Sequence, residues 1–165
     1  MTFILFIALN NYKTVMTAEN IIAQLDLKPH PEGGFYKRTY TDAQQRFSSI
    51  LFLLLKNNFA AFHRISSEEQ WNWYWGDDIL IHEIDKDGNY QQTMLSGNTA
   101  ALQLQYVVKV GHWFASECIG NNGFALCGCT VIPAFRFEDF ELADRKKLAD
   151  LFPQHQQLIN ALTRK

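Results

Sequence analysis

The residues best suited to chemistry lie in residues 62–76, where a histidine and two glutamates precede a run of aromatic side chains. His63 is the only residue of this stretch that titrates near neutral pH, which makes it the natural general base. Glu69 would orient His63, raise its basicity, or act as an acid if the neighbouring tryptophans exclude water from it. The stretch therefore predicts proton-transfer chemistry.

Aromatic side chains follow Glu69 in an alternating pattern. Residues two apart on a strand share a face, so Glu69, Trp71, Trp73 and Trp75 would line one face and Tyr74 the other, unless a bulge reverses them. If the Glu69 face points inward, the tryptophans line a pocket, and their flat rings suit sugars or planar heterocycles. The alternative is that they pack in the core or at a dimer interface.

Further candidates lie outside this stretch. Tyr36, Tyr74 and Tyr106 are candidate proton donors, and Arg38 is suited to hold an anionic group such as phosphate or carboxylate. The structural alternative for Arg38 is a solvated charge that protects an edge strand from aggregation.

The elements that must position these residues are short strands. Turn residues separate apolar or alternating runs, and helical spacing occurs only near the two ends. Helices are expected over residues 17–27, 141–152 and 154–162. The expected strands are 35–40, 48–55, 59–65, 70–75, 79–84, 90–95, 102–110, 113–116 and 124–131. This pattern predicts an all-β fold with one closed or sandwiched antiparallel sheet.

Composition narrows the class of protein. The 165 residues are 47% hydrophobic and 14% aromatic, which favours a packed globule, and the net charge of −2 gives no basic footprint for nucleic acid. The cysteines are three in number, which favours free buried thiols and a reducing, cytoplasmic location over a disulfide framework.

The first 15 residues differ from the rest. Their apolar segment is too short to span a bilayer, and no basic residue precedes it as in a signal peptide. Met16 opens a sequence typical of a protein start. We expect residues 1–15 to be an upstream extension or an extra strand, residues 16–165 to form a single domain, and the protein to have no membrane partner.

Four blocks carry a resemblance to a known family: residues 27–40, 62–77, 127–135 and 137–142. Across them the chain resembles an uncharacterised cupin-like family, known only as a domain of unknown function. The resemblance implies a double-stranded β-helix, or jelly-roll barrel, with a short N-terminal helix and C-terminal helices. It also implies a homodimer and similarity to epimerase cupins such as dTDP-4-dehydrorhamnose 3,5-epimerase. The family usually has histidine at Asn72, whose loss matters only if that side chain points inward.

Against the cupin pattern, the metal ligands are incomplete. Glu69 and Gly76 keep the spacing of the first cupin motif, and His63 occupies the place of its second histidine. Ala61 stands at the first histidine, and Phe114 at the histidine of the second motif. Two good ligands make a weak and unselective site, so we expect no metal and no other cofactor.

These observations favour a cupin that binds a carbohydrate-like or sugar-nucleotide ligand and acts as a metal-independent epimerase or isomerase. The alternatives are a ligand-binding module without turnover and, less favoured, a metal-dependent oxygenase. The expected catalytic residues are His63, Glu69 and Tyr74, and the expected ligand-binding residues are Arg38, Tyr36, Trp71, Trp73, Tyr106 and Phe114.

Overall fold

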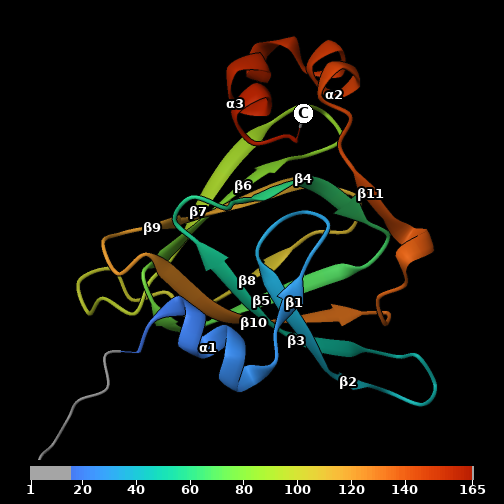
Figure 1. Cartoon of the computed structure of the whole chain (residues 1–165). Coiled ribbons are helices and arrows are strands. Elements are labelled where there is room, and N and C mark those ends of the chain that lie inside the picture. The colour runs from blue at the N-terminus through green and yellow to red at the C-terminus, as the bar shows by residue number, and fades with distance from the viewer. Residues whose placement is uncertain (1–15, 165) are drawn as a thin grey trace, which may run out of the picture.

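Two antiparallel sheets form the body of the molecule (Figure 1). The computed structural model describes residues 16–164. The first sheet has the order β1 (Lys28–Pro29), β2 (Phe35–Thr41), β3 (Ser48–Leu55), β10 (Phe124–Ile132), β5 (Glu68–Gly76) and β8 (Gln105–Val108). The second has the order β11 (Phe140–Leu142), β4 (Ala60–Ile65), β9 (Trp113–Ile119), β6 (Asp78–Ile84) and β7 (Tyr90–Leu95). The order places sequence-distant strands side by side, as a jelly roll does.

The main core lies between the inner faces of the sheets. Strand alternation sends every second side chain inward, and Trp71 meets Phe52 and Phe114 there, each of the three about 1% exposed. These aromatic rings fill the interior, so the space left for a ligand lies elsewhere between the sheets.

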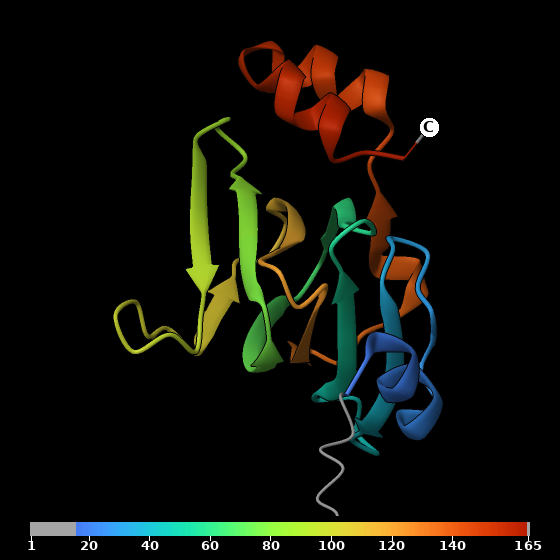
Figure 2. The ribbon, with the colours of Figure 1, turned by 60° about the vertical axis from the view of Figure 1, so that its left-hand side comes forward.

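Helices cover the outer faces at opposite ends of the molecule (Figure 2). At one end, α1 (Ala18–Leu25) begins at Thr17, whose hydroxyl accepts from the Asn20 N–H, and buries Ile21 with Leu53 of β3 and Phe124 of β10. At the other end the helical elements are α2 (Arg145–Leu151), η2 (Pro153–His155) and α3 (Gln156–Ala161), while the short η1 (Phe137–Asp139) lies beside β11. Of these, α2 and α3 pack on outer-face side chains of β4, β6 and β9.

The all-β, jelly-roll prediction with terminal helices is confirmed. The strands expected over residues 48–55 and 90–95 have those bounds, whereas the one expected over 102–110 is shortened to β8. The prediction for residues 1–15 lies outside the described residues. Within residues 16–164, none of the helices is long and apolar enough to cross a membrane.

The packing of α3 generates a stability prediction. Ile159 is fully buried against the sheet, whereas Leu151 of α2 is 62% exposed. We expect Ile159→Ala to lower the free energy of unfolding by about 2–5 kcal/mol, because it removes buried contacts and leaves a cavity. Leu151→Ala is the matched control and should change it by no more than about 0.5 kcal/mol. Urea unfolding measures both, and equal effects would contradict this packing.

Candidate functional site

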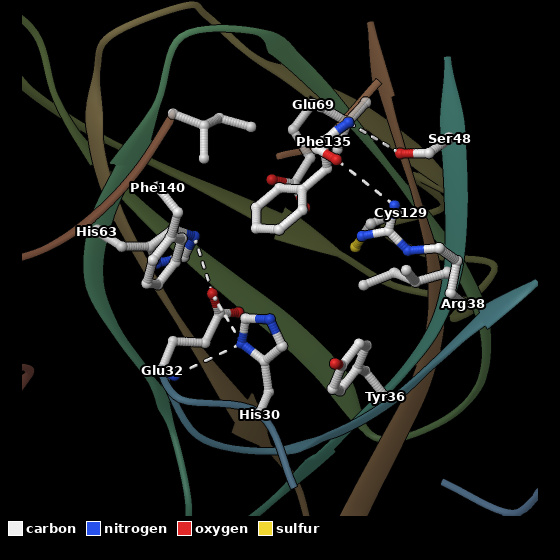
Figure 3. A pocket seen from close by; sticks show the side chains of 13 residues that line it. His30, Glu32, Tyr36, Arg38, Ser48, His63, Glu69, Cys129, Phe135 and Phe140 are labelled. Carbon is white, nitrogen blue, oxygen red and sulfur yellow. Dashed lines mark hydrogen bonds and ion pairs between the residues drawn. The ribbon is translucent and has the colours of Figure 1, made fainter. Parts of the chain in front are cut away.

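A small pocket lies between the sheets beside β1, β2 and β3 (Figure 3). Its volume is about 30 Å³, room for roughly two ordered water molecules. The walls combine apolar rings, among them Phe135 and Phe140, with titratable and cationic groups. These polar lining residues are His30, Glu32, Tyr36, Arg38, His63 and Glu69.

A glycine turn between β1 and β2 carries two of these groups into the pocket. Gly33 has φ +117° and Gly34 has φ +69°, backbone conformations that favour glycine. A Cβ on Gly33 would also collide with the Phe59 carbonyl and the Arg164 side chain. The turn therefore requires glycine, and it places His30 and Glu32 inside rather than on the surface.

The end of the chain holds this turn in place. Arg164 donates from Nε and Nη2 to the Glu32 carbonyl at 3.2 and 2.9 Å, and from Nη2 to the Phe59 carbonyl. The Ala61 N–H donates to the same Glu32 carbonyl at 2.8 Å. The backbone of Glu32 is thus fixed between β4 and the C-terminal segment, which leaves its side chain to the pocket.

The Glu32 carboxylate lies between two histidines. Its Oε2 is 3.3 Å from Nδ1 of His30 and 3.2 Å from Nε2 of His63, and all three side chains are at most 8% exposed. Figure 3 shows Glu32 between the two rings. A buried carboxylate needs such partners because an unpaired charge in the interior is costly.

The two histidines differ in how many of their ring nitrogens contact protein oxygen atoms. Both nitrogens of His63 are occupied, because Nδ1 lies 2.8 Å from the Ala61 carbonyl and Nε2 faces Glu32. His30 contacts Glu32 through Nδ1 only, and its Nε2 points toward the middle of the pocket in Figure 3. The Glu32 backbone N–H also donates to Nδ1 of His30 across 3.5 Å, whereas the carboxylate oxygen lies 3.3 Å from the same nitrogen. In the neutral tautomer that carries its proton on Nδ1, toward the carboxylate, Nε2 is free to accept a hydrogen bond from a ligand.

Protonation of the buried pair follows from competing effects. Burial alone would raise the pKa of Glu32, but His63, His30 and Arg164 outweigh it and hold that pKa below its usual value. Burial lowers the pKa of His63, against the opposing effects of Glu32 and the Ala61 carbonyl. A neutral His63 ring has one N–H, so it can donate to only one of its two oxygen neighbours. The two contacts therefore favour a charged ring, whereas burial favours a neutral one. We favour an ionised Glu32, because it has the most compensating partners.

Glu69 is the second buried carboxyl group of the pocket. Burial, followed by the negative charge of Glu32, raises the pKa of Glu69 to about 8, although a hydrogen bond with Cys129 opposes the rise. At neutral pH Glu69 therefore carries a proton that it can donate. The pocket holds a proton acceptor and a proton donor on opposite sides in Figure 3.

Four of the nine sequence-predicted site residues line this pocket: Tyr36, Arg38, His63 and Glu69. The alternation expected along β5 holds for Glu69, Trp71, Trp73 and Tyr74. It fails at Trp75, because a bulge interrupts the pairing of β5 with β10 and Trp75 packs on Phe124 at the outer face. Tyr74 lies over Gly128 on the outer face and is 52% exposed. It does not reach the pocket, so the geometry gives its expected catalytic role no support.

The other expected ligand-binding residues also lie outside the pocket. Trp71 is a core residue, and the indole N–H of Trp73 donates to the Asp77 carbonyl at 2.8 Å. Trp71 and Trp73 therefore follow the core-packing alternative, whereas Trp75 is 43% exposed. Phe114 is buried against the His63 ring, with the two centroids 4.0 Å apart. Asn72 lies on the outer face of β5, where it donates to the Gly128 carbonyl at 3.3 Å, so the family's histidine there is not lost from the interior.

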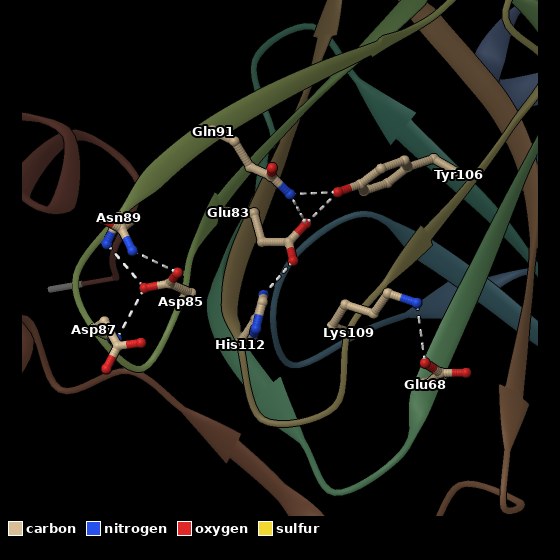
Figure 4. A network of polar contacts seen from close by, with 9 residues as sticks. All are labelled: Glu68, Glu83, Asp85, Asp87, Asn89, Gln91, Tyr106, Lys109 and His112. Atoms are coloured by element: carbon tan, nitrogen blue, oxygen red, sulfur yellow. Dashed lines mark hydrogen bonds and ion pairs between the residues drawn. The ribbon is translucent and has the colours of Figure 1, made fainter.

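Tyr106 belongs to a separate polar network (Figure 4). Its hydroxyl donates to the buried Glu83 carboxylate at 2.7 Å, and Gln91 and His112 contact the same carboxylate. Burial, followed by the bond to Glu83, raises the pKa of Tyr106 to about 12. Protein groups already occupy both oxygens of Glu83, so this network is closed among its own members.

Sequence periodicity did not identify His30 and Glu32 as site residues. They lie in a turn between Pro29 and Gly33, where no strand or helix period applies. The available signal was compositional, because a histidine and a glutamate two residues apart flank a proline and precede two glycines. A turn that must be built from glycine places nearby side chains in defined directions.

The donor set does not fit a cupin metal. Ala61 and Phe114 replace two of the expected histidines, Nε2 of His63 is directed at Glu32, and Glu69 is protonated at neutral pH. Among residues 16–164, no three His, Cys, Asp or Glu side chains are grouped so as to hold a metal ion.

Comparisons with known proteins agree with the fold described above. Residues 19–143 match the family model described as Cupin superfamily (DUF985), while no curated protein matches the chain. A crystal structure from Shewanella oneidensis is 34% identical, with a TM-score of 0.85, over 90% of this chain and 98% of that one. A hypothetical protein from Leishmania major is 30% identical, with a TM-score of 0.85, over 91% and 100%. Oxalate decarboxylase from Bacillus subtilis is 12% identical, with a TM-score of 0.59, over 86% and 38%, and shares the fold alone.

The raised pKa of Glu69 generates a pH prediction. Between about pH 5 and 8 the unfolded chain has lost this proton while the folded chain retains it, so this group makes stability fall as pH rises. Glu69→Gln removes that dependence. We expect the stability of the variant relative to the natural protein to increase by up to about 1.4 kcal/mol per pH unit over this window.

Urea unfolding at several pH values measures this difference. Glu68→Gln is the matched control, because the neighbouring Glu68 is exposed and pairs with Lys109. A pH-independent difference for Glu69→Gln, or one equal to that of the control, would contradict a protonated Glu69.

Proposed function

The chain belongs to the cupin superfamily, in the DUF985 family, and on that premise we propose that its inner pocket is the acid–base site of a metal-independent isomerase or epimerase. One observation carries the proposal: the Glu32 carboxylate lies 3.3 Å from Nδ1 of His30, whose Nε2 faces the pocket across from Glu69, a buried carboxyl group with a raised pKa. A base oriented by a buried carboxylate is a recurrent device for proton transfer.

The proposed reaction begins at a carbon next to a carbonyl group. Nε2 of His30 takes the proton from that carbon, and the electrons of the C–H bond move into an enolate. The Tyr36 hydroxyl, which reaches the same pocket, donates a hydrogen bond to the enolate oxygen. Glu69 then delivers its proton to the opposite face of the carbon. The products are the epimer, a carboxylate on Glu69 and an imidazolium on His30, and exchange with water restores both groups.

His63 has a supporting part in this proposal. The sequence favoured His63 as the base, but both of its nitrogens face oxygen atoms of the protein. It fixes the position of Glu32, which in turn fixes His30. The proposed substrate is a carbohydrate-like hydroxycarbonyl compound, because the pocket offers hydrogen-bonding groups beside the apolar rings of Phe135 and Phe140.

A ligand-binding protein without turnover is the second candidate. It would use the same polar and aromatic lining to hold part of a small ligand, because a whole sugar ring exceeds the pocket volume of about 30 Å³. The expected homodimer and cytoplasmic location stay predictions.

Solvent isotope exchange tests the reaction. Ketoses, aldoses and their phosphate esters are incubated with the protein in D₂O, and NMR follows deuterium entering the carbon next to the carbonyl. We expect exchange with the natural protein and a loss of at least about 10²-fold in rate for His30→Gln. Glu69→Gln removes the group that protonates the opposite face, so it should lose formation of the epimer, which the same NMR spectra follow.

His155→Gln is the matched control, because His155 lies outside the pocket and contacts the Gly88 carbonyl. It should exchange at the rate of the natural protein, and circular dichroism confirms that each variant is folded. Absence of exchange with every compound, or an unchanged rate for His30→Gln, would refute the proposed acid–base site.

A further inference from the structure

The inner pocket opens into a larger groove on the outside of β2. Tyr36, Arg38 and Phe135 line both the pocket and the groove. The groove has a volume of about 530 Å³ against about 30 Å³ for the pocket. A substrate therefore places only a few atoms among the acid–base groups, and the rest of it must lie in the groove.

Cationic side chains dominate the groove. Four cations and two acids line it: Lys28, Lys37, Arg38, Arg136, Asp26 and Glu138. Two of the cations already have carboxylate partners, because Lys28 pairs with Asp26 at 2.6 Å and Arg136 pairs with Asp139 at 2.7 Å. Within residues 16–164, Lys37 and Arg38 form no ion pair, so their positive charges remain available to a ligand.

The position of β2 brings these two side chains to one place. Consecutive residues of a strand point to opposite faces, but β1 pairs only with Phe35 and Tyr36, so the rest of β2 is a sheet edge on that side. Side chains from both faces reach the groove along this edge, and Lys37 and Arg38 both line it.

Arg38 has guanidinium N–H groups available to bind a ligand. Its Nη1 bonds to the Thr41 hydroxyl and the Phe135 carbonyl are long, at 3.4 and 3.5 Å, and its guanidinium lies 5.6 Å from the centroid of the Phe135 ring. A guanidinium held over an aromatic ring keeps its N–H groups aligned for two parallel bonds to an oxyanion. Arg38 therefore stands at the junction of pocket and groove as an anion-binding group.

We propose that the groove binds the phosphate group of a phosphate ester whose reacting carbon enters the inner pocket. This inference rests on the proposed function, because it describes the part of the substrate that lies beyond the acid–base groups. A phosphate dianion matches the two available cations, whereas a carboxylate would neutralise only one.

Binding of inorganic phosphate and pyrophosphate tests the site without a known substrate. Isothermal titration at low ionic strength should show saturable binding of both, with acetate as the carboxylate comparison binding more weakly. We expect Arg38→Gln to weaken pyrophosphate binding at least about tenfold, because it removes charge-assisted hydrogen bonds, and Lys37→Gln to weaken it about threefold. Both side chains are exposed, so the fold should tolerate their loss.

Lys146→Gln is the matched control, because Lys146 is equally cationic and exposed but pairs with Asp150 on α2. It should leave binding unchanged. Failure of the natural protein to bind either phosphate compound, equal binding of acetate, or unchanged binding by Arg38→Gln would overturn the proposal.

The His30→Gln variant separates this inference from the proposed function. It should bind pyrophosphate as the natural protein does while losing isotope exchange. Exchange without phosphate binding would refute the groove alone, and phosphate binding without exchange would refute the acid–base reaction alone.

Discussion

The position of Glu32 is the constraint on which the site depends. A buried carboxylate is tolerated only with compensating partners, and here the partners are His30, His63 and the nearby Arg164. The same residue is tied through its carbonyl to Arg164 and Ala61. The turn before β2, strand β4 and the C-terminal segment therefore all contact this one residue, and Glu32 in turn lies against the proposed base.

Interactions among charged groups explain why Glu32 and Glu69 differ in protonation although they line the same pocket. Glu32 keeps its charge because histidines surround it, and that charge in turn raises the pKa of Glu69 and keeps a proton there. One negative charge thus fixes a proton acceptor on one side and a proton donor on the other. On the neighbouring strands His63, Phe114 and Glu83 lie in one row, and Phe114 separates the pocket from the closed network around Glu83.

The sequence predicted the strands and helices better than it predicted the residues of the site. Strands such as β3 and β7 were predictable because their apolar runs end at clear turns, and Glu69 and Trp71 were placed correctly by strand alternation. Alternation failed at Trp75, which packs on Phe124 at the outer face, because a bulge is a local backbone event that leaves no periodic signal. His30 and Glu32 were not predicted as site residues, because their position depends on a turn and on contacts with Arg164, which is far from them in the sequence.

The central claim is that Glu32 holds His30 in the tautomer whose Nε2 faces the pocket as an acceptor. Nitrogen NMR of ¹⁵N-labelled imidazole rings, assigned by comparison with His30→Gln, tests it at a pH where the ring is neutral. The proposed mechanism requires a protonated Nδ1 and an unprotonated Nε2 for His30, with the tautomer preference lost in Glu32→Gln. A proton on Nε2, or a preference unaffected by Glu32→Gln, would contradict this account of the site.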